Sequence, residues 1–477
     1  MAGLSFRSFA TVLLGLLVGT ALWLIPGAAV AWAGDGAAHF VPPVWTVLPF
    51  VCVLLSIALF PLLVPNTWEY HAPRMSAFWL AVSLLGMVYS VPEGMRFSDA
   101  YGAELFKTYA DYVSFIVLLG SLFVISGGIH ISGNLPGRPG VNAAMLAIGT
   151  LLASLIGTTG AAMLMIRPLI RSNEKRRSQV HVVVFFIFLV CNVGGSLTPI
   201  GDPPLFLGFL KGVPFAWTML TLLPEWAFAS LVLLGLFFAI DTFLIRREGG
   251  FPNTGRVRLH IDGGINILLL CGVIGAVILS GVVHFEHPGI VTGLGTIGWD
   301  DLLRDGGQII LALISIRITA KTIRQNNNFH YGPIKEVAYL FIGIFTTMLP
   351  ALMLLNARGA ELGITSPVAY FWASGALSSF LDNAPTYLAF LATAMGAFSF
   401  DHALQMTQHP AAEQVLKGIS LGSVFMGANT YIGNGPNFMV KSIAEGAGVK
   451  MPSFFGYMLW SGLILLPLFF IVGVLFL

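Results

Sequence analysis

Two apolar segments of this sequence are interrupted by related motifs, Asn192-Val-Gly-Gly-Ser-Leu-Thr-Pro-Ile-Gly-Asp-Pro-Pro204 and Gly427-Ala-Asn-Thr-Tyr-Ile-Gly-Asn-Gly-Pro-Asn437. When Thr198 is aligned with Thr430, Gly201 falls on Gly433. Glycine and proline at this density break a helix and free backbone amides and carbonyls. In a bilayer, such groups are tolerated only where they are buried in protein or line a wet cavity. Paired breaks in two halves of a chain are typical of the ion and substrate site of a secondary transporter.

The composition places the whole chain in a membrane. Hydrophobic residues make up 56% of the 477 residues and charged residues only 10%, whereas soluble proteins carry about 25% charged residues. The net charge of +2, without basic stripes between aromatics, argues against nucleic acid as a partner. The three cysteines show no C-x-x-C spacing, so neither a disulfide framework nor a thiolate metal site is indicated. Membrane lipid is therefore the expected surrounding.

Residues 1–33 form a segment of their own. Arg7 precedes a long apolar run, and Ala31-Trp32-Ala33 then gives the small-x-small pattern of a cleavage site. We expect a signal peptide that is cleaved after Ala33. Because the apolar run is long for such a peptide, an uncleaved N-terminal helix is the alternative.

The rest of the chain contains the same series of apolar segments twice. A spanning helix needs about 20 mainly apolar residues. In each predicted repeat, 34–250 and 251–477, three helices precede an interrupted segment, a broken helix and a final helix. The first series is 44–64, 75–91, 109–131, 142–170, 180–210 and 221–245, and the second is 264–284, 307–322, 336–355, 367–399, 412–440 and 453–477.

The interrupted segments determine how the repeats are oriented. If 142–170 and 367–399 are re-entrant hairpins, each half crosses the membrane an odd number of times, so the second half enters from the opposite face. Most of the 24 lysines and arginines then fall in loops on one side, which we assign to the cytoplasm. We therefore expect an all-α polytopic protein of a bacterial-type inner membrane, with an inverted-topology repeat, two re-entrant hairpins and two broken helices.

Two carboxylates lie at membrane depth, where charge is costly and usually functional. Asp202 lies in the first break, where it can bind a cation or cap the helix that begins at Pro203. Asp382 and Asn383 lie at the predicted tip of the second hairpin. Because Asn383 alone can cap the returning helix, Asp382 is the stronger candidate for the proton-coupled carboxylate, with Asn383 as a sodium ligand beside it. Sodium and protons would compete at both acids, since burial favours the neutral carboxyl and a bound cation favours the ionised one.

Neutral groups at the tips and breaks are further candidates. Their hydroxyls, amides and bare backbone can bind an ion or a small carboxylate, or can satisfy the local backbone, and Asn192 beside the first break has the same two possible roles. The candidates for ion or substrate binding are Thr158, Thr159, Thr198, Gly201, Asn383, Asn429, Thr430, Gly433, Asn434 and Asn437.

No motif indicates catalysis. The sequence lacks H-E-x-x-H, a nucleophile elbow and a phosphate loop, so we expect neither an enzyme nor a cofactor other than a transported or coupling sodium ion. An ion channel is less favoured than a transporter: broken helices also build selectivity filters, but an inverted repeat favours alternating access.

The stretches Ser196-Leu-Thr-Pro-Ile-Gly-Asp-Pro-Pro-Leu-Phe-Leu207 and Ser378-Ser-Phe-Leu-Asp-Asn-Ala-Pro-Thr386 resemble the ion-transporter superfamily, and most closely its NhaD-type sodium/proton antiporters and related citrate transporters. The resemblance covers about residues 40–477. It implies a homodimer in which a transport domain moves as an elevator against a scaffold domain.

The hairpin tips depart from one branch of that superfamily. Its sodium-coupled carboxylate transporters carry Ser-Asn-Thr at each tip, whereas this chain has Gly157-Thr-Thr159 and Asp382-Asn-Ala384. The change removes groups that hold a carboxylate and adds an acid that repels one. The resemblance therefore favours a sodium/proton antiporter, with a sodium-coupled citrate or dicarboxylate transporter as the alternative.

Overall fold

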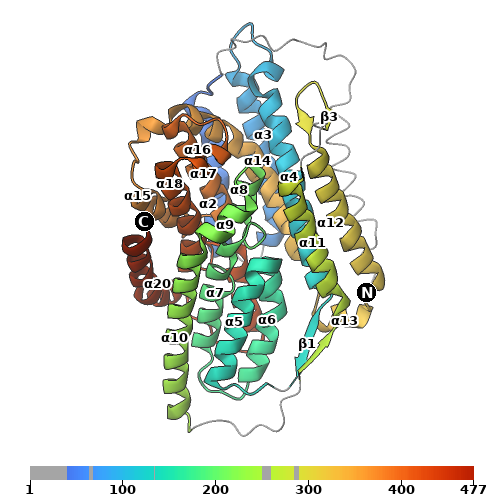
Figure 1. Cartoon of the computed structure of the whole chain (residues 1–477), viewed down its shortest axis with the longest axis vertical. Helices are drawn as coiled ribbons and strands as arrows, with labels where there is room; N and C mark the ends of the chain where they lie inside the picture. Colours follow the sequence, from blue (N-terminus) through green and yellow to red (C-terminus); the bar gives the residue numbers. More distant parts are fainter. Residues whose placement is uncertain (1–39, 64–67, 134, 250–258, 284–288) are drawn as a thin grey trace.

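Helices account for nearly all of the regular structure (Figure 1). The computed structural model describes residues 40–63, 68–133, 135–249, 259–283 and 289–477, so the predicted signal peptide lies outside the described residues. Within these ranges, seven helices are long and apolar enough to cross a membrane. The prediction of an all-α polytopic membrane protein is confirmed.

The first half contains the predicted series of elements. Its three leading helices are α2 (Leu48–Leu63), α3 (Trp68–Ser90) and α4 (Ala103–Ser126), with the short turns η1 (Val44–Val47) and η2 (Ser98–Gly102). After β1 (His130–Gly133) come the hairpin α5 (Pro139–Ile156) and α6 (Thr158–Asn173), the broken helix α7 (Val180–Leu189), η3 (Val193–Leu197) and α8 (Pro203–Leu210), then α9 (Phe215–Thr221) and α10 (Leu223–Arg247).

The second half repeats this order. It begins with β2 (Leu259–Asp262), α11 (Ile265–Val282), β3 (Ile290–Val291), β4 (Thr296–Ile297), α12 (Trp299–Ile318), α13 (Lys321–Asn326), α14 (Gly332–Arg358) and η4 (Gly359–Leu362). It continues with the hairpin α15 (Pro367–Ser378) and α16 (Asn383–Phe398), α17 (Ala403–Gln408), the broken helix α18 (Pro410–Phe425), η5 (Met426–Asn429) and α19 (Gly435–Gly446), and finally α20 (Phe454–Phe476). The elements that the sequence analysis missed are short: η2, η4, α9, α13, α17 and the strands.

The two hairpins lie in opposite parts of the molecule, as an inverted repeat requires. Figure 1 shows α5 and α6 in the lower half of the view and α15 and α16 in the upper half. In the first hairpin the chain reverses at Gly157, whose φ of 80° is a left-handed conformation that glycine adopts without strain. The repeat boundaries at 34–250 and 251–477 stay a prediction.

The helices fall into two groups. The group α2, α3, α4, α11, α12 and α14, called here the scaffold group, is held together by contacts such as those of α14 with α3 and of α12 with α4. The other, called here the hairpin group, contains both hairpins, both broken helices, α10 and α20. The strand pair of β1 and β2 lies where the chain passes between them, because β1 follows α4 and β2 precedes α11, with His130 opposite Asp262.

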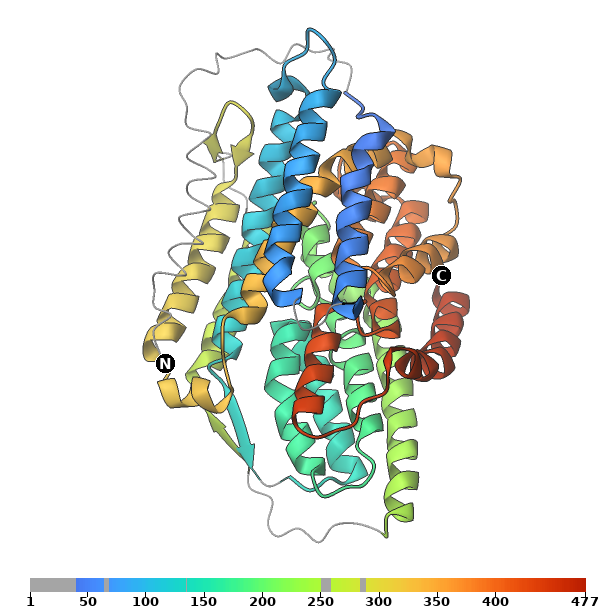
Figure 2. The same cartoon turned by 180° about the vertical axis from the view of Figure 1, so that it is seen from behind.

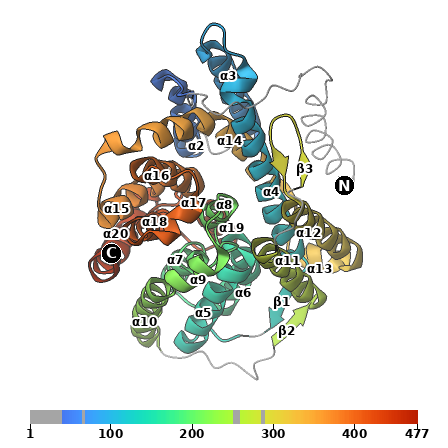
Figure 3. The same ribbon diagram turned by 45° about the horizontal axis from the view of Figure 1, so that its top comes forward.

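The second part of each broken helix packs against the hairpin of the other half. α8 contacts α16, and α19 contacts α6 and α7. Figure 3 shows α19 beside α6, and in Figure 2 the red α19 lies against the teal hairpin of the first half. Each break is therefore enclosed by elements from both halves of the chain.

Each break also contains a close approach of two backbone segments. A Cβ on Gly201 would overlap the carbonyl oxygen of Gly195, and a Cβ on Gly433 would lie 2.6 Å from the carbonyl oxygen of Gly427. The two contacts are equivalent in the alignment of Thr198 with Thr430. In both copies, therefore, the close backbone leaves no room for a side chain larger than that of glycine.

We predict that Gly201→Ala and Gly433→Ala each destabilise the protein by about 1–3 kcal/mol, because the added methyl group must displace backbone. Gly435→Ala is the matched control, since a Cβ there meets nothing within 4 Å and the residue lies two positions from Gly433. Unfolding temperatures in detergent measure the difference. Equal effects of Gly433→Ala and Gly435→Ala would show that the close approach does not exist.

Candidate functional site

Asp202 lies where both hairpin tips and both breaks meet. Its side chain is only 1% exposed. Its carboxylate accepts a hydrogen bond of 2.9 Å from the Thr158 hydroxyl at the first tip and one from the Asn383 side-chain amide at the second tip. The Asn434 amide of the second break donates a third bond at 3.3 Å. The structure thus brings together four residues that the sequence analysis proposed separately.

The charge of Asp202 is met only by neutral donors. A buried carboxylate normally pairs with a cationic side chain, but no salt bridge in the described part of the chain includes Asp202. The hydroxyl and the two amides leave one negative charge uncompensated. This site can therefore take up one proton or one monovalent cation.

The capping roles of the two acids are the reverse of those predicted. Asp202 makes no side-chain hydrogen bond to the start of α8, where Pro203 and Pro204 offer no N–H. Asp382, in contrast, caps α16 by accepting a bond of 3.0 Å from the backbone N–H of Ala384. Asn383, which could have supplied this cap, donates to Asp202 instead. The reason given for preferring Asp382 as the proton carrier therefore fails.

Two buried amide oxygens of the second half, one at its hairpin tip and one in its break, have no hydrogen-bond donor among the described residues. They are Oδ1 of Asn383, beside Asp202, and Oδ1 of Asn429, whose amide nitrogen donates to the Ser379 hydroxyl at 2.9 Å. Buried polar atoms nearly always have a partner, so an exception calls for an explanation such as an ion. Both oxygens are suitable cation ligands, in keeping with the predicted roles of these residues.

The threonines of the two breaks have equivalent contacts. Thr198 donates its hydroxyl proton to the carbonyl of Ser154, and Thr430 donates to the carbonyl of Ser379 at 2.5 Å. The Thr430 hydroxyl oxygen also accepts from the N–H of Gly433 at 3.1 Å. These bonds tie each break to the hairpin of its own half. The prediction that the two threonines bind an ion is not tested by these contacts.

A cavity of about 50 Å³ adjoins the first tip. Thr158, Thr159 and Gly201 lie on one side of it. The opposite wall belongs to the scaffold group: Leu119, Leu122 and Phe123 of α4 and Pro333, Ile334 and Val337 of α14. A space of this size holds a few water molecules. A small solute can therefore approach the first tip along the boundary between the two groups.

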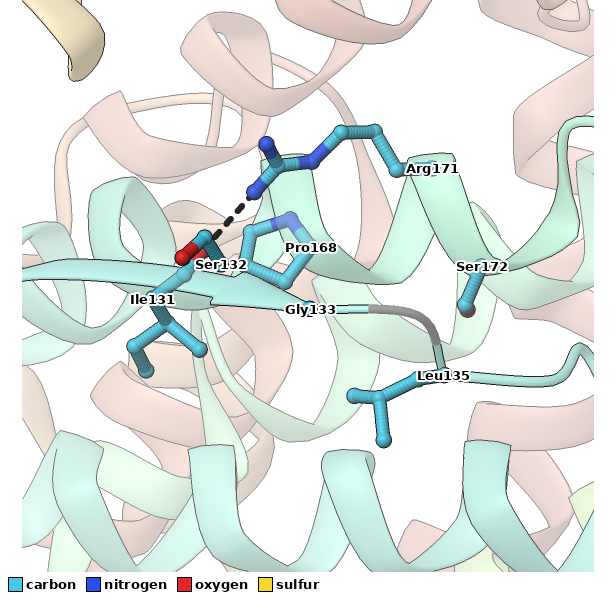
Figure 4. Close-up of a pocket in the computed structure, with 7 residues that line it drawn as sticks. All are labelled: Ile131, Ser132, Gly133, Leu135, Pro168, Arg171 and Ser172. Carbon is cyan, nitrogen blue, oxygen red and sulfur yellow. Dashed lines mark hydrogen bonds between the residues drawn. The ribbon is translucent and has the colours of Figure 1, made fainter. Parts of the chain in front are cut away.

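A second cavity, of about 40 Å³, lies between β1 and α6 (Figure 4). Arg171 crosses it and donates a hydrogen bond of 2.8 Å to the carbonyl of Ile131, which Figure 4 marks with a dashed line. None of the predicted site residues lines this cavity. It is therefore separate from the site around Asp202.

We predict that Asp382→Asn preserves the start of α16, because an asparagine oxygen can still accept from Ala384. Asp382→Ala removes the cap and should destabilise the protein by about 0.5–2 kcal/mol. Unfolding temperatures of the two variants, compared with the parent, test this difference. If both variants unfold at the parent temperature, the observed cap contributes nothing to stability.

Comparison with known proteins agrees with this architecture. None of the curated proteins matches the chain. A family model with the description "Putative citrate transport" matches residues 39–477. That range contains both hairpins, both breaks and every candidate site residue. Because the match covers nearly the whole sequence, the chain belongs to this citrate-transport family of membrane transporters.

Proposed function

We propose that the protein is a secondary active transporter, not an enzyme, that exchanges sodium ions for protons across a bacterial-type inner membrane. The observation that carries this proposal is the buried carboxylate of Asp202, which has only neutral donors from both halves of the chain. A proton or a sodium ion can neutralise it, but not both at once. Competition for one carboxylate is the simplest basis for obligatory exchange.

The sodium ion would bind beside Asp202 at the second tip. The oxygen of Asn383, which has no donor among the described residues, is one candidate ligand, because the nitrogen of the same side chain bonds Asp202, and the Asn429 oxygen in the second break is another. Unwound backbone at broken helices coordinates sodium in transporters of this general design. Asp382 is the second acid of the site, and its cap on α16 suggests that it acts mainly by holding the tip in shape.

Alternating access would come from movement of the hairpin group against the scaffold group, in a homodimer that provides a fixed frame. Two contacts between the groups support this proposal. Lys211, directly after α8, forms a salt bridge of 2.6 Å with Asp111 of α4. The cavity at the first tip has a wall from each group. A movement along this boundary would break the Lys211–Asp111 salt bridge and change the shape of the cavity.

The alternative is sodium-coupled transport of citrate or a dicarboxylate. The description of the family favours it. The two acids at the site oppose it, because Asp202 and Asp382 would repel an anionic substrate. An ion channel is the less favoured third possibility, and it would conduct without coupling.

We predict that Asp202→Asn abolishes sodium-driven proton movement, because the variant lacks the charge for which the two ions compete. Its fold should persist, since the Asn383 amide can flip so that its oxygen accepts from the new amide at position 202. Asp382→Asn should keep exchange, with a shifted pH profile. The assay is the purified protein in liposomes that contain a pH-sensitive dye, with a sodium pulse.

Other results of this assay would change the assignment. Normal exchange by Asp202→Asn together with loss in Asp382→Asn would make Asp382 the carrier. No proton movement in the parent, together with accumulation of labelled citrate on a sodium gradient, would establish the carboxylate transporter. Large uncoupled currents would indicate a channel.

We further predict that a crosslink between positions 111 and 211 stops transport. The double variant Asp111→Cys/Lys211→Cys has Cys52, Cys191 and Cys271 replaced by alanine. A short bis-methanethiosulfonate reagent then joins the two groups through two disulfide bonds, which a reducing agent can cleave. A reducing agent should restore exchange. The control pair Lys441→Cys/Glu445→Cys lies within α19, where the native side chains form a salt bridge of 3.4 Å, and its crosslink should leave exchange intact. Full activity of the crosslinked 111–211 protein would exclude relative movement of the groups.

A further inference from the structure

A cluster of buried amides joins the two breaks. Asn192 follows α7 in the first half, whereas Asn434 and Asn437 belong to the second break. Asn192 and Asn437 are fully buried, and Asn434 is nearly so. The bonds among these three residues join the two broken helices directly, beside the bond from Asn434 to Asp202.

Asn437 fixes the backbone of the second break. Its amide nitrogen donates to the carbonyls of Gly427 and Thr430, both at 2.9 Å. Its oxygen accepts a bond of 2.8 Å from Asn192, whose nitrogen also donates to the carbonyl of Ile187 in α7 at 2.8 Å. With these partners, Asn437 satisfies local backbone, which is one of the two roles that the sequence leaves open for it.

Asn192 also contacts the residue that donates to the central carboxylate. Its oxygen lies 3.3 Å from the amide nitrogen of Asn434. The same nitrogen donates to the carbonyl of Cys191 at 2.9 Å and lies 3.3 Å from Asp202. The Cys191 carbonyl and the Asn192 side-chain oxygen, both just after α7, therefore orient the Asn434 amide toward Asp202.

The repeat does not require this pair of asparagines. In the alignment of Thr198 with Thr430, Asn192 corresponds to Val424 and Asn437 corresponds to Leu205. Val424 and Leu205 are also buried, so an apolar side chain fits each place in the fold. Burying amides in place of apolar groups gains little stability even when they are paired. A role in the site explains their presence better than packing does.

We infer that Asn192 and Asn437 form a clasp that keeps the two breaks in one unit and orients the Asn434 amide toward Asp202. Both are positioning residues, because neither touches Asp202 itself among the described contacts. The inference rests on the proposed function, in which Asp202 exchanges a sodium ion for a proton. Loss of the clasp should therefore weaken ion binding more than it slows the movement of the hairpin group.

The test uses the side chains that the repeat itself places at these positions, Asn192→Val and Asn437→Leu. Each should raise the sodium concentration for half-maximal exchange about tenfold, with the maximal rate nearly unchanged. The double variant should need no more sodium for half-maximal exchange than the single variant with the larger increase, because both residues act through the bond between them. If Asn192→Val does not fold, the smaller change Asn192→Ser should give the same loss of affinity.

The matched control is Asn173→Leu. Asn173 forms an equally buried amide pair with Asn142, with both bonds at 2.9 Å, but lies at the end of α6 away from the site. It should lower the unfolding temperature without changing the sodium requirement. If the clasp variants also lose stability but keep a sodium requirement within about twofold of the parent, the clasp is structural only and the inference is wrong.

Failure of the proposed function gives a different result. In that case the parent protein itself shows no response of proton movement to sodium, whatever the variants do. The same variants are then compared for uptake of labelled citrate, and the same tenfold criterion on the half-saturating concentration decides whether the clasp positions the site.

Discussion

The broken helices must satisfy their backbone where a bilayer offers no water. The solution is the same in both halves. In each half, the hydroxyl of the break threonine, Thr198 or Thr430, donates to a backbone carbonyl at the end of the first helix of that half's hairpin. A serine at the same helix end donates back to a carbonyl of the break: Ser154 to Gly194 at 2.6 Å, and Ser379 to Met426 at 3.1 Å. The hairpins are therefore the partners that allow the breaks to exist.

This constraint explains why the sequence predicts so much of the fold. Glycine and proline inside apolar segments mark the breaks and tips, and segment length marks the spans, so both could be located without coordinates. What the sequence could not provide is the direction of each polar side chain. Asn383 donates to Asp202 across 181 positions of sequence. From the sequence of the second tip alone, Asn383 is a possible cap and a possible sodium ligand, but its bond to the distant Asp202 could not be foreseen, nor that Asp382 would cap the helix.

The two halves share a framework but differ in chemistry. Where the first break has Asp202, the second has Asn434, and the acid Asp382 is found at only one tip. In the structure, Asp202 accepts from neutral donors of both halves, whereas Asp382 accepts from the backbone at the start of α16. A symmetric repeat with an acid in each break would place two like charges in one buried space, which is unfavourable at low dielectric. The asparagine at position 434 therefore avoids a second carboxylate in contact with Asp202.

If the hairpin group moves against the scaffold group as proposed, the pairing of β1 with β2 would limit that movement. Two of the connections between the groups, from α4 to α5 and from α10 to α11, contain β1 and β2. The hydrogen bonds between these strands hold the two connections side by side. A rigid body anchored at one point pivots about it and does not slide freely. The displacement of each part of the hairpin group would then increase with its distance from the β1–β2 pair. A small rotation about the β1–β2 pair would therefore produce a large displacement at the far end of the hairpin group.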